Sequence, residues 1–263
     1  MLADRGGLEA AVSARPLLAI VPARGGSKGL PGKNVRPLAG IPLLMHSVFC
    51  ARMCPVVDRI VISTDDDVIA KIASQYDTDV VHRPAALADD RTPMWPVVQH
   101  AVAAIERSDA YRYEAVLLLD PTSPGRLPSD IVDALVALER PPECDGVVGV
   151  SVPEFNPYWH CVVEDGGFMR VLFPGADQYT RRQDVPPVYR INATLYCWFR
   201  DFVLNASTWR TGRLKMQVVP EERAVHIDTA EQFELTDLRV RHGLLQLPWL
   251  DPTSLTKAVA QTS

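Results

Sequence analysis

The residues best suited to chemistry lie in one loop near the start of the chain, with the sequence A-R-G-G-S-K-G-L-P-G-K-N. The loop combines four glycines with three cationic side chains, those of Arg24, Lys28 and Lys33. Glycine lets backbone N–H groups approach an anion closely, and arginine and lysine add full positive charges. Only five lysines occur in the whole chain, and two of them lie here. This combination predicts a binding site for a polyphosphate.

Neither of the two common phosphate-binding patterns occurs in this loop. Ser27 stands where the first glycine of G-x-x-x-x-G-K-S/T would be needed, and there is no G-x-G-x-x-G. The alternative interpretation is an ordinary surface turn, which is the usual meaning of clustered glycine and proline. However, the loop directly follows the apolar run at residues 17–21, which suits a strand buried on both faces. A ligand-binding loop is therefore favoured.

The elements that would position this loop alternate between strand-like and helix-like runs. Their order predicts an α/β fold with a mostly parallel, Rossmann-like sheet and helices on both faces. We expect strands at residues 17–21, 59–63, 115–119, 146–151 and 214–219, and helices at 42–52, 66–76, 95–107, 130–140 (behind Ser129 as N-cap) and 230–242. Ligands of such sheets bind beyond the carboxyl ends of the strands, where the glycine loop, Asp65 and Asp120 all fall.

One segment, residues 153–190, interrupts this alternation. It contains two short β-like runs around Asp165-Gly166-Gly167, which predicts an inserted β-hairpin. Such a ribbon suits a lid or a subunit contact, and a solvent-exposed ornament is the alternative. We therefore divide the chain into a flexible tail at residues 1–16, one domain at 17–247 that carries this insertion, and a second tail at 248–263.

Charge and composition narrow the range of partners. The 263 residues carry a net charge of −5 with a pI of about 5.7, which argues against a nucleic-acid partner. Five cysteines without a C-x-x-C spacing are typical of buried thiols and of a reducing, cytoplasmic compartment. The acid-containing N-terminus does not read as a signal peptide, and no apolar run approaches the ~20 residues of a membrane span. We expect a small anionic substrate and no membrane partner.

Six segments together resemble the acylneuraminate cytidylyltransferases, the enzymes that make CMP-sialic acid and related CMP-nonulosonates. In family order they are the glycine loop, R-I-V-I-S-T-D, H-R-P-A-A-L-A-D-D, L-L-D-P-T-S-P, R-Q-D-V-P-P-V-Y-R-I-N-A-T-L-Y and H-I-D-T. The resemblance implies a nucleotidyltransferase-type sheet and Mg²⁺-dependent transfer of CMP from CTP to a sialic-type nonulosonic acid, with release of pyrophosphate. It also implies a homodimer, because members commonly pair through the inserted segment.

An enzyme of this kind holds a triphosphate and aligns an attacking hydroxyl with the α-phosphorus. Positioning and cations carry most of such catalysis. The predicted catalytic residues are Arg24, Lys28, Lys33 and Asp120. The predicted nucleotide-binding residues are Arg24, Gly25, Gly26, Ser27, Lys28 and Lys33, to which the resemblance adds Asn34 and Arg83.

Asp120 and Asp228 are the predicted ligands of Mg²⁺, which prefers oxygen atoms converging from different strand ends. Asp120 follows the apolar run A-V-L-L-L, and more distant sugar nucleotidyltransferases have a metal-binding aspartate at the equivalent strand end. The family often reads I-D-I-D before the last helix, whereas this chain reads V-H-I-D. His226 therefore replaces one carboxylate, its own role stays open, and we expect Asp120 to compensate by pairing with Asp228.

Asp228 has a second interpretation as a helix cap. It could accept a hydrogen bond from the Glu231 amide at the start of the last helix. Thr229 and Gln232 form an equally good capping box one residue later, so Asp228 is not needed for this purpose.

The acceptor side is expected in R-Q-D-V-P-P-V-Y-R-I-N-A-T-L-Y, at Arg182, Gln183, Asn192 and Tyr196. A nonulosonic acid carries a carboxylate and many hydroxyls, and the fork of an arginine can bond both oxygens of a carboxylate. Arg190 is assigned to a structural ion pair, with a shared role on the carboxylate as the alternative.

Three rival interpretations stay open. The first is cytidylyl transfer to another acid, such as Kdo or a secondary-metabolite acceptor. The second is a nucleotide-sugar glycosyltransferase in which Asp65-x-Asp67 is the metal motif, although a diphosphate sugar needs fewer cations than this loop supplies. The third is a catalytically weakened homologue, suggested by His226 and by Ala193, which stands where the family usually has glycine after the asparagine.

Overall fold

The computed structural model describes residues 15–26, 29–89, 92–139 and 142–251, and its centre is a seven-stranded sheet with the order β11-β7-β10-β6-β1-β4-β5. The sheet strands are β1 (Leu17–Pro22), β4 (Arg59–Thr64), β5 (Asp79–His82), β6 (Ala115–Leu118), β7 (Gly146–Ser151), β10 (Arg190–Phe199) and β11 (Leu214–Val218). Every neighbouring pair is parallel except those formed by β10, which runs antiparallel to both β6 and β7. Two small hairpins, β2 (Pro37–Leu38) with β3 (Ile41–Pro42) and β8 (Val162–Asp165) with β9 (Phe168–Val171), lie outside this sheet.

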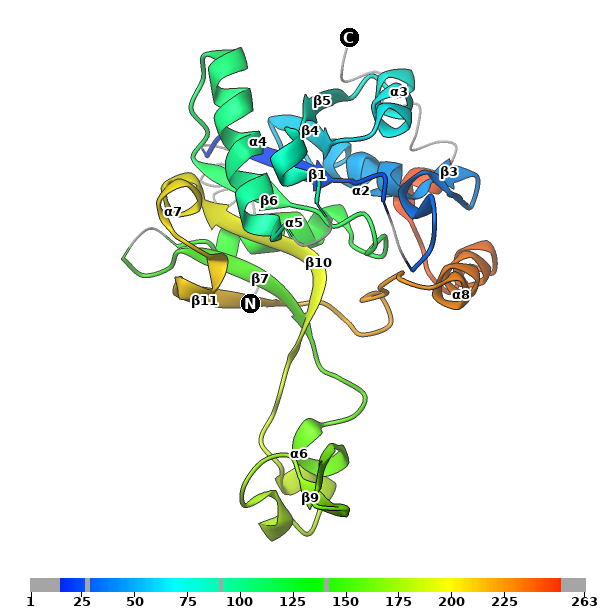
Figure 1. Ribbon diagram of the computed structural model, residues 1–263, viewed down its shortest axis with the longest axis vertical. Helices are drawn as coiled ribbons and strands as arrows, with labels where there is room; N and C mark the ends of the chain where they lie inside the picture. Colours follow the sequence, from blue (N-terminus) through cyan, green and yellow to red (C-terminus); the bar gives the residue numbers. More distant parts are fainter. Residues whose placement is uncertain (1–14, 27–28, 90–91, 140–141, 252–263) are drawn as a thin grey trace, which may run out of the picture.

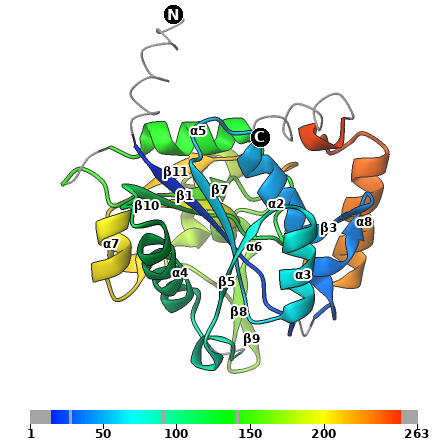
Figure 2. The same ribbon diagram turned by 90° about the horizontal axis from the view of Figure 1, so that it is seen from above.

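Helices cover both faces of the sheet (Figure 2). One face carries α2 (Leu43–Arg52), α3 (Asp67–Gln75) and α5 (Pro128–Ala137), and the other carries α4 (Met94–Asp109) and α7 (Arg200–Asn205). The last helix, α8 (Ala230–Arg241), packs against the β2–β3 hairpin, and the short α6 (Pro157–His160) follows β7. Short 3₁₀ helices are η1 (Lys33–Val35), η2 (Ala85–Leu87), η3 (Ala176–Gln178), η4 (Arg182–Asp184), η5 (Trp209–Thr211) and η6 (Pro248–Leu250).

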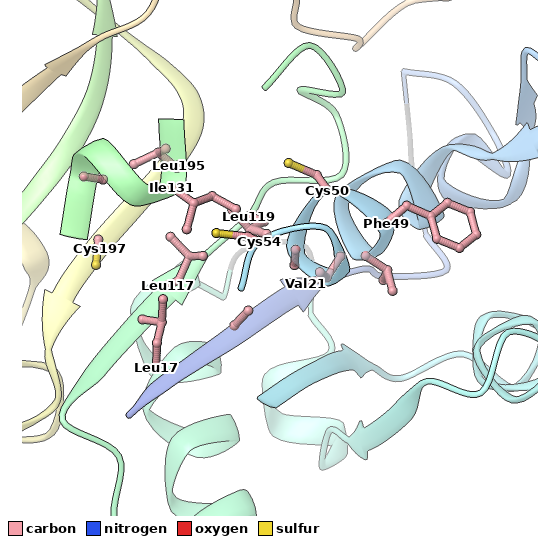
Figure 3. Close-up of a cluster of buried hydrophobic side chains, with 14 of the residues drawn as sticks. Leu17, Val21, Phe49, Cys50, Cys54, Leu117, Leu119, Ile131, Leu195 and Cys197 are labelled. Atoms are coloured by element: carbon pink, nitrogen blue, oxygen red, sulfur yellow. The ribbon is translucent and has the colours of Figure 1, made fainter. Parts of the chain in front are cut away.

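Alternation along the central strands divides the core into two layers. Leu17, Ala19 and Val21 of β1 face α2 and α5, whereas Leu18 and Ile20 face α4. Because successive side chains of a strand point to opposite faces, a fully apolar run is what a doubly covered strand requires. Figure 3 shows the first layer, in which side chains of β1, β6 and β10 meet those of α2 and α5.

The α/β architecture and the mostly parallel sheet predicted from the sequence are confirmed. The five predicted strands and five predicted helices occur within a few residues of their expected ends. Two strands of the central sheet, and the two short strands β2 and β3, were not predicted. β5 is only four residues long with an exposed aspartate and histidine at its ends, and β10 begins with the polar segment that had been assigned to acceptor binding.

The prediction that Ser129 is the N-cap of α5 is wrong. The helix begins at Pro128 with Leu127 as N-cap, and the Asp130 carboxylate accepts a hydrogen bond of 2.7 Å from the Leu127 amide. Proline suits the first helical position because its missing N–H would have no partner there. By contrast, the predicted capping box of Thr229 and Gln232 on α8 is present.

The insertion between β7 and β10 projects from the domain as a separate lobe (Figure 1). It contains the predicted hairpin, β8–β9, whose turn residues Gly166 and Gly167 have φ values of 60° and 88°. Positive φ at both central positions is the geometry of a tight two-residue turn that glycine adopts without strain. Within this lobe the half-buried rings of Tyr158 and Phe173 stack with their centroids 4.3 Å apart.

The prediction of a C-terminal tail from residue 248 onward is wrong for residues 248–250. Residues 248–250 form η6, and Trp249 is completely buried in the layer beside α2. Its indole N–H donates a hydrogen bond of 2.9 Å to Nδ1 of His46. At the other end, residues 1–14 of the predicted N-terminal tail lie outside the described residues, whereas the Pro16 carbonyl accepts hydrogen bonds from the Glu114 and Ala115 amides.

His46 makes the stability of this layer dependent on pH. Burial lowers the pKa of His46 from 6.5 to about 4, although its hydrogen bond to the Leu38 carbonyl opposes this shift. The neutral ring is therefore favoured in the fold, so its contribution is complete above pH 6.5 and is lost as the pH falls toward 4. We expect the free energy of unfolding to fall by about 2 kcal/mol between pH 7 and pH 5 through this residue.

Urea unfolding of the wild-type protein and of His46→Gln at several pH values measures this contribution. Glutamine does not titrate, so the variant should lose less stability than the wild-type protein over the same range. Parallel pH profiles of the two proteins would contradict the assignment.

Candidate functional site

A cavity of about 330 Å³ lies beyond the carboxyl ends of β1 and β6. After β1 the chain continues to β4 and β5 on one side of β1 and then returns to β6 on the other side. The loops that follow β1 and β6 therefore diverge. Such a divergence is where α/β sheets bind ligands. The cavity is lined by Pro22, Arg24, Lys33, Asn34, Arg83, Leu87, Ala88, Asp89, Thr92, Met94, Val97, Asp120, Pro121, Thr122, His226 and Asp228.

A larger cavity, of about 500 Å³, lies at the opposite end of β1 and β6. It is lined by none of the predicted site residues, and the Arg112 and Arg200 side chains in its wall form ion pairs with Asp201. Because the predicted site residues line the first cavity and not this one, the first cavity is the candidate site.

The glycine loop folds against the segment that carries Asp228. A Cβ atom on Gly29 would lie 2.5 Å from the Asp228 carbonyl oxygen, so no larger residue fits without moving this backbone. Gly32 has a φ of 67°, which glycine adopts readily, and it starts η1. Two predicted residues, Ser27 and Lys28, lie outside the described residues. Gly25 and Gly26 follow Arg24 at the start of the loop.

Lys33 and Asp228 form the central ion pair of the cavity. The Lys33 ammonium group is almost completely buried and donates hydrogen bonds of 2.7 Å to the Ile227 carbonyl and to Oδ1 of Asp228. Partial burial would raise the pKa of Asp228, but the hydrogen bonds and charges of Lys33 and His226 hold this pKa below its ordinary value. Asp228 is therefore ionised at neutral pH, and it holds the ammonium group of Lys33, which lies 195 positions earlier in the sequence.

His226 connects Asp228 to Asp120. Its Nε2 lies 2.9 Å from Oδ2 of Asp228, and its Nδ1 lies 3.2 Å from Oγ1 of Thr122. Thr122 in turn donates hydrogen bonds to Oδ1 of Asp120 from its hydroxyl group, at 2.7 Å, and from its amide, at 2.9 Å. The two predicted carboxylates thus belong to one network, in which the histidine is the bridge.

The helix-cap interpretation of Asp228 is not supported by this geometry. Its carboxylate holds Lys33 and His226, while Thr229 caps α8 by accepting a hydrogen bond from the Gln232 amide. Asp66 performs the corresponding function at α3, where it accepts a hydrogen bond of 2.9 Å from the Ile69 amide.

Asp120 fits Mg²⁺ better than Asp228 does. In the described part of the chain no residue hydrogen-bonds Oδ2 of Asp120, and this residue lines the cavity. Both oxygens of Asp228 already have partners. No group of three histidine, cysteine, aspartate or glutamate residues that could hold a metal occurs among the described residues. Further ligands would have to be phosphate oxygens and water, which is how Mg²⁺ is commonly bound.

Arg83 and Asn34 support the wall of the cavity beside Arg24. Arg83 donates hydrogen bonds to the hydroxyl group and carbonyl of Ser63, at 3.0 and 2.7 Å, and Asn34 donates one of 3.0 Å to the Arg24 carbonyl. The residues from Leu87 to Val97 that line the cavity were not predicted individually. Their position after β5, at the same edge of the sheet as the glycine loop, would have been the signal, but β5 itself was not predicted.

The four predicted acceptor residues fall into two groups. Asn192 and Tyr196 lie on β10, where Tyr196 is in register with Leu118 of β6. Arg182 and Gln183 lie in η4 on the projecting lobe (Figure 1), where Arg182 donates a hydrogen bond of 3.1 Å to the Glu154 carbonyl. None of the four residues lines the cavity. The chain therefore does not bring these two pairs together, because the insertion carries η4 out of the domain.

Asn192 is a buried residue with one unsatisfied donor. Its Oδ1 accepts hydrogen bonds from the amide and hydroxyl group of Thr194, at 3.1 and 2.7 Å, whereas its Nδ2 has no hydrogen-bond partner. A buried polar group without a partner is costly, and it points to a ligand or an ordered water. Arg190, as predicted, forms a bidentate ion pair, with Glu221.

Ala193 lies in a bulge of β10 with a φ of 58°. A side chain in this left-handed region costs about 1–2 kcal/mol, and glycine escapes this cost although it loses more entropy on folding. We expect Ala193→Gly to raise the free energy of unfolding by about 0.5–1 kcal/mol. Urea unfolding measures the change. Ala206, with a φ of −80°, is the matched control, and its replacement by glycine should be destabilising. A loss of stability in Ala193→Gly would contradict the strain.

No helix in the described part of the chain combines the length and the apolar character that a membrane crossing needs.

Comparison with known proteins shows which sequences and folds this chain is similar to. The family model for Cytidylyltransferase matches residues 18–122. The CMP-N,N'-diacetyllegionaminic acid synthase of Legionella pneumophila is 32% identical, over 84% of this chain and 94% of that protein. An N-acylneuraminate cytidylyltransferase of Escherichia coli is 33% identical, over 83% of this chain and 51% of that protein. Among solved structures, CMP:2-keto-3-deoxy-manno-octonic acid synthetase complexed with CTP aligns with a TM-score of 0.64 and 14% identity, over 87% of this chain and 99% of that one.

Proposed function

The chain belongs to the acylneuraminate cytidylyltransferase family and is a nucleotidyltransferase, and from this premise we propose that it transfers CMP from CTP to a nonulosonic acid and releases pyrophosphate. The observation that carries the proposal is the cavity beyond β1 and β6, in which Arg24, Lys33 and Arg83 face the carboxylates of Asp120 and Asp228. Cations and carboxylates together at one strand edge suit a metal-assisted reaction of a triphosphate.

In this reaction the acid's hydroxyl oxygen forms a bond to the α-phosphorus, while the bond between that phosphorus and the bridging oxygen of pyrophosphate breaks. The protein's task is to hold the triphosphate and to offset its charge. Lys33 is held by Asp228 and the Ile227 carbonyl, which fixes the ammonium group at the cavity wall. Arg24 and the predicted cation Lys28 would add positive charge from the glycine loop.

We propose that Asp120 holds Mg²⁺ against the phosphate oxygens, with Asp228 linked to it through His226 and Thr122. When bound, Mg²⁺ would neutralise charge that develops on the leaving pyrophosphate. No described residue hydrogen-bonds Oδ2 of Asp120, which supports this role, and the hydrogen bonds from Thr122 to Oδ1 would keep the carboxylate oriented.

On the acceptor side, the unpartnered Nδ2 of Asn192 and the hydroxyl group of Tyr196 are suited to the hydroxyls of a sugar acid. Arg182 and Gln183 would reach an acceptor only if the lobe met a second chain. We propose such a homodimer, because the lobe exposes large apolar side chains: Phe168 is 79% exposed, Met169 77% and Phe155 60%. Exposed apolar patches of this kind mark interaction surfaces.

We propose that the reaction takes place in the cytoplasm. All five cysteines are free thiols, and four of them are buried. Free cysteines in this number are usual where the compartment keeps thiols reduced.

The decisive experiment is pyrophosphate release by the purified protein with CTP, Mg²⁺ and a panel of acids: N-acetylneuraminic acid, N,N'-diacetyllegionaminic acid and Kdo. Release that depends on one of the first two acids supports the proposal. Release with Kdo alone would move the acceptor to a different acid. Release of a nucleoside diphosphate, or CTP binding without turnover of any acid, would contradict the proposed reaction.

A further inference from the structure

Arg126 is a completely buried cation just behind the candidate site. Its side chain is 0% exposed, and no carboxylate of the described residues lies within ion-pair distance of it. Burial lowers the pKa of Arg126, and the carboxylates of Asp120 and Asp130 oppose this shift at longer range. Its position in P-T-S-P-G-R is only six residues beyond Asp120, but the side chain turns inward instead of toward solvent.

The guanidinium group joins three separate elements. Its Nε donates a hydrogen bond to the Thr194 carbonyl in the β10 bulge, and its Nη2 donates one to the Asp120 carbonyl after β6. Its Nη1 donates a hydrogen bond of 2.6 Å to the hydroxyl group of Ser47 on α2, which lies 3.4 Å from the same Asp120 carbonyl. The Ser123 amide also donates to this carbonyl, at 3.2 Å.

Stability does not account for a charged group at this position. A buried charge without a partner of opposite charge is costly, and apolar side chains of similar volume often replace buried ionic groups without loss. What the arginine adds is geometry, because its planar fork holds donors in fixed directions, which neither lysine nor methionine can reproduce.

The two carbonyls that Arg126 holds belong to the segment after β6, which carries Asp120, and to the β10 bulge, which carries Asn192. Asp120 lines the cavity. Thr194 closes the bulge in which Ala193 has a left-handed backbone and Asn192 has its unpartnered Nδ2. A second contact, from the Ser123 hydroxyl group to the Asn192 carbonyl at 3.4 Å, runs between the same two segments.

We propose that Arg126 is a positioning residue that holds the Asp120 carboxylate and the Asn192–Thr194 bulge in one fixed relative geometry. Its catalytic consequence rests on the proposed function, since the reacting oxygen of the acid must meet the α-phosphorus at close to the correct distance and angle. A displacement of about 1 Å between positioned groups can cost on the order of 100-fold in rate.

Arg126→Lys and Arg126→Met test this role. We expect both variants to fold, to bind CTP with a dissociation constant within about threefold of the wild-type value, and to lose on the order of 100-fold in kcat. Arg223→Met is the matched control: Arg223 bonds the Gly125 carbonyl and pairs with Asp130 beneath the same loop, away from the cavity. This control should lower the melting temperature and leave kcat within a few-fold. A kcat near the wild-type value in either Arg126 variant would overturn the proposal.

Hydrogen exchange provides a readout that does not need turnover. In Arg126→Lys the amides of Thr122, Ser123 and Thr194 should exchange about 10-fold faster, and together, while the amides of β1 and β4 stay unchanged. A uniform increase across the sheet would mean a purely structural role and would overturn the proposal. If the wild-type protein turned over no acid, the proposed function would fail, but the exchange data would still decide whether Arg126 couples the two segments.

Discussion

Asp120→Asn is expected to lower kcat on the order of 1,000-fold without unfolding the protein, which is the scale of losing a charged contact to the transition state. Asparagine retains Oδ1, so the hydrogen bonds from the Thr122 amide and hydroxyl group can persist. It lacks the negative charge with which Oδ2 of Asp120 would hold Mg²⁺. Steady-state pyrophosphate release at several Mg²⁺ concentrations measures the effect, and the apparent affinity for Mg²⁺ should fall with kcat.

Asp67→Asn is the matched control for Asp120→Asn. Asp67 is an exposed residue in the first turn of α3 and does not line the cavity. In the glycosyltransferase interpretation it would be a metal ligand and its loss would abolish activity. In a cytidylyltransferase its replacement should leave kcat nearly unchanged. Near-normal activity of Asp120→Asn together with an inactive Asp67→Asn would therefore reverse the metal assignment.

A strand or helix could be predicted from the sequence where its pattern of apolar residues matches the burial of those residues in the fold. β1 is buried at every residue and is apolar throughout, so its sequence alone predicts a doubly covered strand. β10 is equally central, but its first half contains Arg190, Asn192 and Thr194 and is broken by a bulge. Residues 190–195 do alternate polar and apolar side chains, as strands often do, but this segment was assigned to acceptor binding and not to a strand. Its pairing with β6 and β7 depends on contacts distant in sequence.

The residues of the candidate site could likewise be predicted only where a local pattern indicated them. Residues at strand ends, such as Arg24 and Asp120, were predicted because the carboxyl edge of a parallel sheet is a known place for ligands. The pairing of Lys33 with Asp228 joins residues 195 positions apart, and no local pattern indicates it. Arg126 could not be predicted as a buried residue either, because arginine is among the residue types least often fully buried. Its burial follows from carbonyls that only the folded chain brings together.

Arg182 and Gln183 were grouped with Asn192 and Tyr196 because they lie close to these residues in sequence. In the fold, η4 belongs to the projecting lobe (Figure 1) and β10 belongs to the sheet. Proximity in sequence does not imply proximity in space where an insertion leaves and re-enters a domain. A second chain would be needed to bring the two pairs to one acceptor.

Trp249→Ala is expected to cost about 3–5 kcal/mol of unfolding free energy, the range measured for large-to-small changes in well-packed cores. Trp249 is 0% exposed, and its ring lies edge-on to that of His46, with centroids 6.0 Å apart. Alanine would leave a cavity beside α2 and would remove the donor that Nδ1 of His46 accepts from. In a domain of this size the melting temperature should fall by roughly 10 °C. Thermal and urea unfolding measure both quantities.

Two further variants separate the causes of this loss. Trp249→Phe retains most of the ring but has no N–H group, so it should lose only about 1 kcal/mol, the value of one buried hydrogen bond. Leu244→Ala, at a nearby side chain that is 73% exposed, should stay within about 0.5 kcal/mol of the wild-type value. If Trp249→Ala changed stability no more than Leu244→Ala, Trp249 would belong to a loose tail, as its position in the sequence suggests. A large loss would instead make residues 248–250 part of the domain, with Trp249 covering the helix that carries both His46 and Ser47, the partner of Arg126.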